Sequence, residues 1–309
     1  MKQFLAIIAL AGLAVSAGQP ARTPNAMEER ISDIVRQFRG VLGVAALDLR
    51  SREWIAVNAA TRFPTASTIK TAVMIEAHHQ AADGRLPLDA KFTLRDTDKV
   101  GGSGVLNGLH DGLVLTTADL IHLMIVSSDN TATNLLVERL GTTRINQRLE
   151  SYGIHEVKLF RPTFRDGRAD VLPDLEREFG LGMATPRDMV RLMALIADGK
   201  AVDRKASDLM LATLRRQQDR AMIPRLLPSL PGVSIANKTG SDEEKHAGAD
   251  NINRHVRADA AIVTGPDFAY AVAIFAREIE DTRWGVENDG VTTGARISRL
   301  LFDHFAGRH

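Results

Sequence analysis

The chain has 309 residues, of which 44% are hydrophobic and 25% are charged, and it contains no cysteine. This is the composition of an ordinary globular protein with one large or two smaller domains, and it excludes disulfides as a source of stability. The formal net charge is only +1, so the composition gives no electrostatic reason to expect nucleic acid or an anionic membrane surface as a partner.

The first 17 residues have the pattern of a secretory signal. Lys2 precedes an apolar run from Phe4 to Val15, which is short for a membrane span, and small residues suited to cleavage follow it. The alternative is a retained N-terminal anchor. We expect a signal peptide at 1–17, a flexible tail at 18–26, and a secreted, periplasmic protein without stable membrane contact after cleavage.

Beyond the tail, the spacing of apolar residues predicts helices and strands in a defined order. Helices are expected over 27–38, 67–79, 117–126, 131–140, 143–152, 186–198 and 291–305. Strands are expected over 41–49, 54–58, 233–237, 258–264 and 268–276. The residues from 160 to 182 carry several prolines and glycines, and we expect a long irregular loop of the kind that usually has a function.

This order of elements predicts an α/β (α+β) fold. The simplest packing brings the five strands into one antiparallel sheet flanked by the terminal helices. The helical block between the second and third strands then forms an inserted all-α lobe, and a cleft is expected where the two lobes meet. We expect one domain at 27–309, with an α/β lobe at 27–62 and 215–309 and an all-α lobe at 63–214.

A serine stands three residues before a lysine in the stretch from Arg62 to Lys70, which reads R-F-P-T-A-S-T-I-K. At the start of a helix these two residues share a face, so Ser67 Oγ and Lys70 Nζ can meet. A lysine with a lowered pKa can take the proton of a serine, and the free N–H groups of a helix start add a positive field. The pattern predicts a serine that forms an acyl-enzyme.

Two further motifs follow in the chain. Ser128, Asp129 and Asn130 form S-D-N in the turn between two predicted helices, and K-T-G begins at Lys238, at the end of the third predicted strand. Each motif alone is weak, because three-residue patterns arise by chance. All three in this order are a strong signal of one catalytic site.

With the wider matches R-F-P-T-A-S-T-I-K-T-A-V-M and I-V-S-S-D-N-T-A-T-N-L-L, the chain resembles the class A β-lactamases and their penicillin-binding relatives from about Met27 onward. The resemblance implies that Ser67 is the nucleophile, that Lys70 accepts its proton, and that Ser128 relays a proton to the leaving nitrogen. We expect no cofactor and no metal.

The resemblance also implies where the substrate binds. It places the substrate against Asn130, Lys238, Thr239, Gly240 and Ser241. Asn130 would bind the side-chain amide and position the lysine of S-x-x-K, and K-T-G would hold the carboxylate. The backbone N–H groups of Ser67 and Ser241 would form an oxyanion hole. The expected partner is a β-lactam or a peptidoglycan stem peptide, bound by a monomer.

The long loop departs from the family pattern. Class A enzymes carry E-x-x-L-N there, and its glutamate activates the water that hydrolyses the acyl-enzyme; this chain has no such motif. The usual spacing leads to the neighbourhood of Phe164. Asp166 and Glu176 are candidate substitutes, and the alternative is that both are solvated loop charges. Deacylation is therefore the step that the sequence leaves open.

Other features weigh less. The His78–His79 pair has no metal-ligand spacing, and we expect both residues on a helix surface. The segment from Gly101 to Gly104 lacks the lysine of a phosphate loop, and by resemblance it borders the active-site entrance. The segment 242–254 is longer than a hairpin requires and is expected to rim the cleft, where Arg254 or Arg257 could clamp a carboxylate.

The sequence therefore predicts a serine β-lactamase-like hydrolase. One alternative is a peptidoglycan D,D-peptidase or transpeptidase with the same acylating residues. Another is a non-hydrolytic penicillin-binding or sensor domain that stays acylated. The missing E-x-x-L-N motif favours both alternatives, whereas the small single-unit chain and the S-T-I-K context favour the hydrolase.

Overall fold

The computed structural model describes residues 25–244 and 253–307, so the expected signal peptide and most of the expected tail lie outside the described residues. The first helix, α1, begins at the end of that tail. Asn25 Oδ1 accepts a hydrogen bond from Glu28 N, and the Glu28 side chain accepts one from Asn25 N. This capping box sets the start of α1.

The described residues form helices and strands in an order that matches the expected one. They add an unexpected helix of 11 residues over Arg204–Leu214 and several short elements. The helices are α1 (Ala26–Gln37), α2 (Lys70–Ala82), α3 (Thr117–Val126), α4 (Asn130–Leu140), α5 (Thr142–Ser151), α6 (Pro173–Phe179), α7 (Pro186–Ala197), α8 (Arg204–Leu214) and α9 (Asp289–Phe305). The strands are β1 (Val41–Asp48), β2 (Trp54–Val57), β3 (Phe63–Pro64), β4 (Lys91–Thr93), β5 (Val114–Thr116), β6 (Val157–Leu159), β7 (Gly182–Ala184), β8 (Ser234–Glu243), β9 (His255–Thr264) and β10 (Ala269–Ile279).

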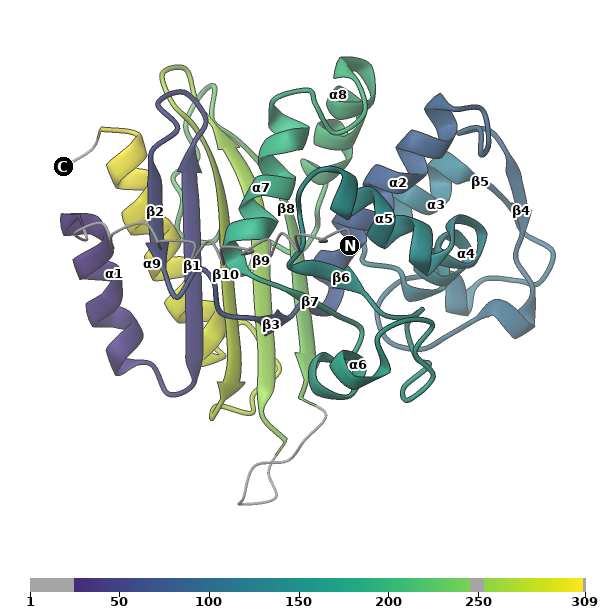
Figure 1. Cartoon of the computed structure of the whole chain (residues 1–309), viewed down its shortest axis with the longest axis horizontal. Coiled ribbons are helices and arrows are strands. Elements are labelled where there is room, and N and C mark those ends of the chain that lie inside the picture. Colours follow the sequence, from purple (N-terminus) through teal and green to yellow (C-terminus); the bar gives the residue numbers. More distant parts are fainter. Residues whose placement is uncertain (1–24, 245–252, 308–309) are drawn as a thin grey trace, which may run out of the picture.

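The predicted five-stranded antiparallel sheet is confirmed, in the order β2-β1-β10-β9-β8 (Figure 1). Side chains alternate between its two faces, as the pleat of a strand requires. In β1, Leu42 and Val44 join the core beneath α1 and α9, whereas Ala45 and Leu47 join the core on the opposite face, where α7 packs. The sheet is thus covered on both faces, and β8 is the edge that faces the helical insert.

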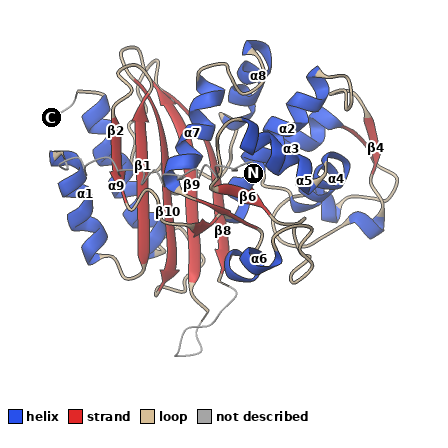
Figure 2. Cartoon of the chain, in the orientation of Figure 1, coloured by secondary structure: helices blue, strands red, loops and turns tan. Residues whose placement is uncertain are grey.

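The insert contains the helices α2 to α5 together with short strands that the sequence did not indicate. These strands form a three-stranded sheet in the order β3-β7-β6 and a pair formed by β4 and β5 (Figure 2). Strands of two or three residues are too short to show a period of two, which explains why the pattern missed them. Helix α7 was expected in the all-α lobe at 63–214, but it packs on the large sheet. The boundary between the two lobes therefore stays a prediction.

Several expected element bounds are wrong. Helix α2 begins at Lys70 rather than at residue 67, and β9 begins at His255 rather than at residue 258. The segment 160–182 is not wholly irregular, because it contains α6, which begins with Pro173 at its first position and ends at Gly180. K-T-G does not end its strand but lies inside β8. The polar residues after Gly240 continue the strand because they pair with β9 as far as Glu243 opposite His255, and such long-range pairing leaves no local signal.

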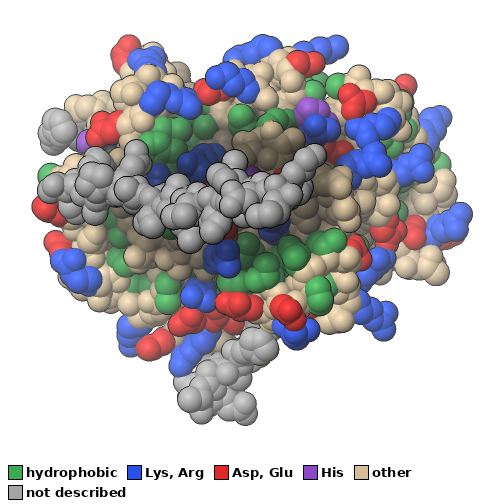
Figure 3. Space-filling model, viewed as in Figure 1, with side chains coloured by type: hydrophobic (Ala, Val, Ile, Leu, Met, Phe, Trp, Pro, Cys, Tyr) green, Lys and Arg blue, Asp and Glu red, His purple; other side chains and the backbone are tan. Residues whose placement is uncertain are grey.

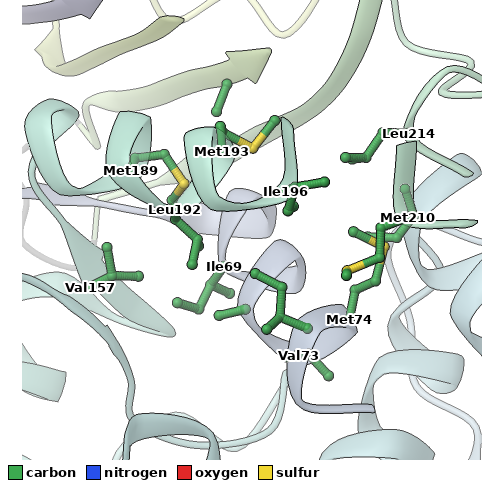
Figure 4. Packing of buried hydrophobic residues seen from close by; sticks show 14 of the residues in the cluster. Ile69, Val73, Met74, Val157, Met189, Leu192, Met193, Ile196, Met210 and Leu214 are labelled. Carbon is green, nitrogen blue, oxygen red and sulfur yellow. The ribbon is translucent and has the colours of Figure 1, made fainter. Parts of the chain in front are cut away.

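The predicted position of His78 on a helix surface is also wrong, because this side chain is buried. Helix α2 packs among α3, α4, α5 and α8, and its apolar residues share one core with those of α7. Figure 4 shows Val73 and Met74 of α2 among side chains of α7 and of α8. A helix enclosed on several sides has no wide solvent face, so even its polar residues are covered.

The surface mixes both signs of charge. Lys and Arg side chains are interspersed with Asp and Glu on the face seen in Figure 3, in keeping with the small net charge of the chain. Among the described residues, none of the helices is long and apolar enough to cross a membrane.

Candidate active site

Ser67 lies in a 3₁₀ turn, Ala66–Ile69, that leads directly into α2. The neighbouring Thr68 is buried, and its Oγ1 donates a 2.7 Å hydrogen bond to Thr65 O, whereas Ser67 is half-buried. Ala66 has a φ of +43°, a left-handed conformation that costs free energy for a residue with a Cβ and that recurs at active sites. The turn therefore presents Ser67 to the cleft on a constrained backbone.

Lys70 is completely buried, and its ammonium group contacts the S-D-N turn. Its Nζ donates hydrogen bonds to Ser128 O at 2.7 Å, to Ser128 Oγ at 3.2 Å and to Asn130 Oδ1 at 2.8 Å. These three acceptors match the three N–H donors of the protonated amine, whereas the neutral amine can donate to two of them and keeps a lone pair. Within the described part of the chain, Lys70 Nζ makes no hydrogen bond with Ser67 Oγ, so the direct contact expected from the spacing is absent.

The S-D-N turn is fixed by Asp129, whose carboxylate is buried. Its Oδ1 accepts a hydrogen bond from Ala132 N and so caps α4, and its Oδ2 accepts from Val105 N at 2.7 Å and Leu106 N at 2.9 Å. Ser128, just before it, has a φ of +56°. The cap and the loop contacts together hold this uncommon backbone conformation in place.

Lys238 reaches the same serine hydroxyl from β8. Its Nζ donates to Ser128 Oγ at 3.0 Å and to Thr239 O at 2.7 Å, and the side chain is completely buried. Ser128 Oγ therefore lies between the amino groups of Lys238 and Lys70. A hydroxyl in this position can accept a proton from one amine while giving its own proton elsewhere.

The buried surroundings change the acidity of both lysines. Burial, and then the charge of Lys238, hold the pKa of Lys70 well below its usual value, although Asp129 opposes this. Burial lowers the pKa of Lys238 to about 8, against the opposing charges of Asp259 and Asp219. A lysine with a strongly lowered pKa can act as a proton acceptor near neutral pH, and Lys238 stays mostly cationic there.

Strand β8 lies against the turn that carries the serine. A Cβ added to Gly240 would fall 2.7 Å from Thr65 O, 2.9 Å from Ser67 N and 3.0 Å from Thr68 N. All three are backbone atoms, which cannot move aside without moving the turn. The glycine of K-T-G is therefore required by this close approach of two backbones.

Two cavities meet at the serine. The residues that line both of them are Ser67, Ser103 and Ser241. The larger cavity, of about 750 Å³, also contacts Asn130, and the smaller one, of about 220 Å³, also contacts Ser128 and Thr239. The structure thus brings residues of all three motifs to one cleft between β8 and the helical insert.

A family model described as a β-lactamase enzyme family matches residues 26–305. The chain belongs to this β-lactamase enzyme family. The predicted fold class and the predicted serine β-lactamase-like hydrolase are confirmed at the level of this family.

Individual relatives agree with this assignment. β-Lactamase CARB-3 of Pseudomonas aeruginosa is 24% identical over 219 residues, which are 70% of this chain and 72% of the relative. A β-lactamase of Streptomyces cellulosae is 28% identical over 273 residues, which are 85% of this chain and 81% of the relative.

Solved structures extend the likeness to the fold. The crystal structure of a β-lactamase from Sphaerobacter thermophilus superposes with a TM-score of 0.77 at 30% identity and covers 91% of this chain and 97% of its own. The structure of PBP-A superposes with a TM-score of 0.76 at 25% identity and covers 93% of this chain and 99% of its own.

In this β-lactamase family member, the long loop is held together by Arg161. This buried guanidinium donates from Nε to Glu176 Oε1 at 2.7 Å and also pairs with Asp166. Glu176 is buried and accepts a further hydrogen bond from Gly167 N, so it is not a solvated loop charge. Asp166 is exposed and lines the larger cavity, whereas Glu176 is not among the described residues that line it.

The sequence did not indicate that a residue of the long loop is anchored to α4. Thr163 is buried, and its N and Oγ1 donate to Asn134 Oδ1 at 2.8 and 2.9 Å, while Asn134 Nδ2 donates to Thr163 O. Asn134 lies one helical turn after Asn130 on α4, so an i, i+4 reading from S-D-N could have found it. Thr163 and the adjacent Phe164 line the larger cavity.

The remaining predicted features lie around the cleft. Gly102 borders the larger cavity, and so do the ends of the 242–254 segment at Asp242 and Asn253, while 245–252 lie outside the described residues. Arg257 is buried and donates to the carbonyl oxygen of Arg283, so its guanidinium is already engaged. Among the described residues, no group of three or more His, Cys, Asp or Glu side chains could hold a metal.

Replacement of Gly240 by alanine tests the close approach of β8 to the serine turn. We expect Gly240→Ala to slow covalent modification of Ser67 by a β-lactam about 100-fold, because shifts of about 1 Å at a reacting centre cost that much. Intact-mass spectrometry over time measures the rate. The control is Gly108→Ala, whose added Cβ would meet nothing within 4 Å. Modification of Gly240→Ala at the wild-type rate would contradict the packing argument.

Asp259, opposite Thr239 on β9, should make the stability of the protein depend on pH. Burial raises its pKa to about 7, although its Oδ2 accepts a hydrogen bond from Ile223 N. Its pKa in an unfolded chain is about 3.9. Between these values only the folded state keeps the proton, so the contribution of Asp259 to the unfolding free energy falls as pH rises from about 4 to about 7, by up to about 1.4 kcal/mol per pH unit. Burial lowers the pKa of His78 to about 4, and this group makes a contribution of the opposite sign up to about pH 6.5.

We expect Asp259→Asn to remove this component of the pH dependence, as measured by urea unfolding at several pH values. Lys238 does not interfere, because its lowered pKa acts above pH 8. Asp208→Asn, which removes an exposed carboxylate on α8, should keep the wild-type dependence. An unchanged slope between pH 4 and pH 7 in Asp259→Asn would refute the assignment.

Proposed function

We propose that this enzyme hydrolyses the amide bond of β-lactams through an acyl-enzyme on Ser67. The observation that carries the proposal is the position of Ser128 Oγ, which both buried lysines contact, beside a nucleophile at the junction of two cavities. The β-lactamase relatives support the substrate class.

In the acylation step, Ser67 Oγ attacks the lactam carbonyl while its proton passes to neutral Lys70 Nζ. The backbone N–H groups of Ser67 and Ser241 stabilise the oxyanion; a single donor of this kind is typically worth about 10²–10³ in rate. When the C–N bond breaks, Ser128 Oγ gives its proton to the leaving nitrogen and takes one from Lys70. The absence of a direct Ser67–Lys70 hydrogen bond is compatible with this step, since catalytic contacts often tighten only with substrate bound.

The two cavities suggest how the substrate lies. The smaller cavity contacts Ser128 and Thr239. Lys238, whose Nζ donates a hydrogen bond to Ser128 Oγ, supplies a buried cation for the ring carboxylate. The larger cavity contacts Asn130, whose amide would bind the side-chain amide of the substrate. Asn130 Nδ2 also donates to Gly101 O, which fixes the orientation of this side chain.

For deacylation we propose Asp166 rather than Glu176 as the acid that activates water. Asp166 lines the cavity that contains Ser67, whereas Glu176 is buried and its Oε1 accepts from Arg161 and from the backbone of Gly167. A buried carboxylate that holds a loop together is better suited to a structural role.

A second candidate function is acylation followed by slow release, as in a D,D-peptidase or a penicillin-binding domain. Two observations favour it. The loop residue anchored on α4 is Thr163, which cannot act as a carboxylate base. A point mutant of PBP-A, whose structure is 25% identical in sequence to this chain, is described as an acyl-enzyme complex with penicillin G.

We further propose that the protein is exported and acts as a monomer in the periplasm after removal of residues 1–17. The charged and then apolar pattern of those residues supports export. Protease mapping of the mature N-terminus from a periplasmic extract would test it.

A chromogenic cephalosporin distinguishes the two candidate functions when colour and intact mass are followed together. Sustained colour with a transient adduct on Ser67 is the expected result, and Ser67→Ala should abolish both. Ser51→Ala, which removes an exposed turn serine, is the matched control and should behave as wild type. A single burst that leaves a lasting adduct would support the second candidate instead, and no adduct at all would refute both.

Substitution of the loop acids tests the deacylation step. Asp166→Asn should let the acyl adduct accumulate and lower turnover about 10²–10⁴-fold with an unchanged acylation rate, because an amide cannot accept the proton. Glu176→Gln should mainly lower the Tm, since it weakens the pairing with Arg161. Asp174→Asn, an exposed acid of the same segment, is the control. Unchanged turnover in Asp166→Asn would show that this carboxylate does not activate the water.

A further inference from the structure

Two aromatic side chains remain largely exposed in the cavity that contains Ser67. Phe164 is 58% exposed and Trp284 is 56% exposed, and both line the larger cavity. They come from separate parts of the chain, the loop between β6 and α6 and the loop between β10 and α9. Large aromatic side chains gain most from burial, so their exposure inside a binding cavity indicates an apolar ligand group.

The backbone and its neighbours hold Phe164 in this position. The residue has a φ of +56°, which is uncommon for a bulky side chain and needs support from the surroundings. That support comes from the preceding Thr163, which three hydrogen bonds fix to Asn134. A Cβ on Gly102 would fall 2.9 Å from the Phe164 ring, so the loop after β4 needs glycine there to make room for the ring.

Protein contacts hold one side of the Trp284 ring. Its ring lies 4.5 Å from the ring of His255, measured between centroids, and the guanidinium of Arg257 lies 5.0 Å from its centroid. Arg257 also donates to the carbonyl oxygens of Arg283 and Trp284 at 3.0 and 3.4 Å. One side of the indole is therefore fixed by protein contacts, while more than half of the residue remains available to a ligand.

If the proposed function is correct, the two rings lie in the cavity that would hold the acyl side chain of the substrate. The smaller cavity, with Ser128 and Thr239, is the one that suits the ring carboxylate. The acyl side chain of the substrate then extends into the larger cavity, past Asn130 and towards the two aromatic residues. Rings that are already fixed lose little conformational entropy when they bind a ligand.

We propose that Phe164 and Trp284 form a subsite for an uncharged aryl group at the end of the acyl side chain of the substrate. Both rings line the cavity into which this group would extend, and they come from separate loops. The carboxylates of Asp242, Glu243 and Glu244 line the same cavity, so an anionic aryl group is disfavoured there. The proposal rests on the proposed function only for the direction in which the substrate lies.

Acylation rates of two penicillins test the subsite. Benzylpenicillin and the penicillin with an acetyl side chain share the bicyclic ring, the carboxylate and the side-chain amide, and differ in the aryl group. Wild type should acylate faster with benzylpenicillin. Phe164→Ala and Trp284→Ala should each reduce this preference about tenfold, which is the range for loss of one apolar contact. The rate with the acetyl compound should change little.

Control variants come from the same two loops. Leu172→Ala and Val286→Ala remove side chains that are 45% and 54% exposed and that are not among the described residues lining this cavity. Both should keep the wild-type preference. The subsite would be refuted if Phe164→Ala and Trp284→Ala both keep the wild-type preference for benzylpenicillin. It would also be refuted if the control variants lose this preference to the same extent.

Binding of a fragment tests the subsite without any acylation. The chain has two tryptophans, so Trp54→Phe leaves Trp284 as the sole source of indole fluorescence. In a Ser67→Ala, Trp54→Phe protein, phenylacetylglycine should change this fluorescence and acetylglycine should not, and Phe164→Ala should weaken the binding about tenfold. If no β-lactam acylates Ser67, the proposed function fails while this fragment assay still decides the subsite. Equal binding of both fragments would refute it.

Discussion

The structure depends on a serine hydroxyl placed between two buried amines. Burial of a lysine is costly unless each of its donors finds an acceptor, and here Ser128 Oγ serves both Lys70 and Lys238. The other acceptors are Ser128 O, Asn130 Oδ1 and Thr239 O, so the S-D-N and K-T-G segments satisfy the two amines between them. Because the same burial lowers the pKa of both lysines, the arrangement that satisfies their hydrogen bonds also prepares proton transfer.

This arrangement requires unusual backbone geometry, which the surrounding packing supplies. Ala66 and Ser128 both have positive φ, and the contact of Gly240 with the serine turn leaves no room for a side chain. Such conformations persist only where neighbouring elements determine them. The core on the α7 face of the sheet extends under α2, and the cap at Asp129 fixes the start of α4. Stability and reactivity of the site are thus linked through the same elements.

The residues proposed for the release step lie in the long loop, apart from those proposed for acylation. The residues proposed for acylation lie on the serine turn, at the start of α2, in the S-D-N turn and on β8, whereas any acid that activates water must come from elsewhere. The loop is fixed to α4 through Thr163 and closed internally by Arg161 with Glu176. The residues that it contributes to the cavity include a threonine, an exposed aspartate and an exposed aromatic ring, beside Arg161 and Leu181. The rate of release and the choice of acyl side chain can therefore change in this loop without disturbing the nucleophile.

The sequence by itself determined the elements and the chemistry that depend on neighbours along the chain. Apolar spacing predicted α3 over Thr117–Val126, and the order of three motifs predicted the family, and both are confirmed. The role of Ser67 as nucleophile stays a prediction. Tertiary structure decided what depends on distant residues: the length of β8, the burial of His78, and the choice of Ser128 rather than Ser67 as the hydrogen-bond partner of Lys70. The physical reason is that strand pairing, enclosure of a helix and the satisfaction of a buried amine are set by groups that meet only when the chain is folded.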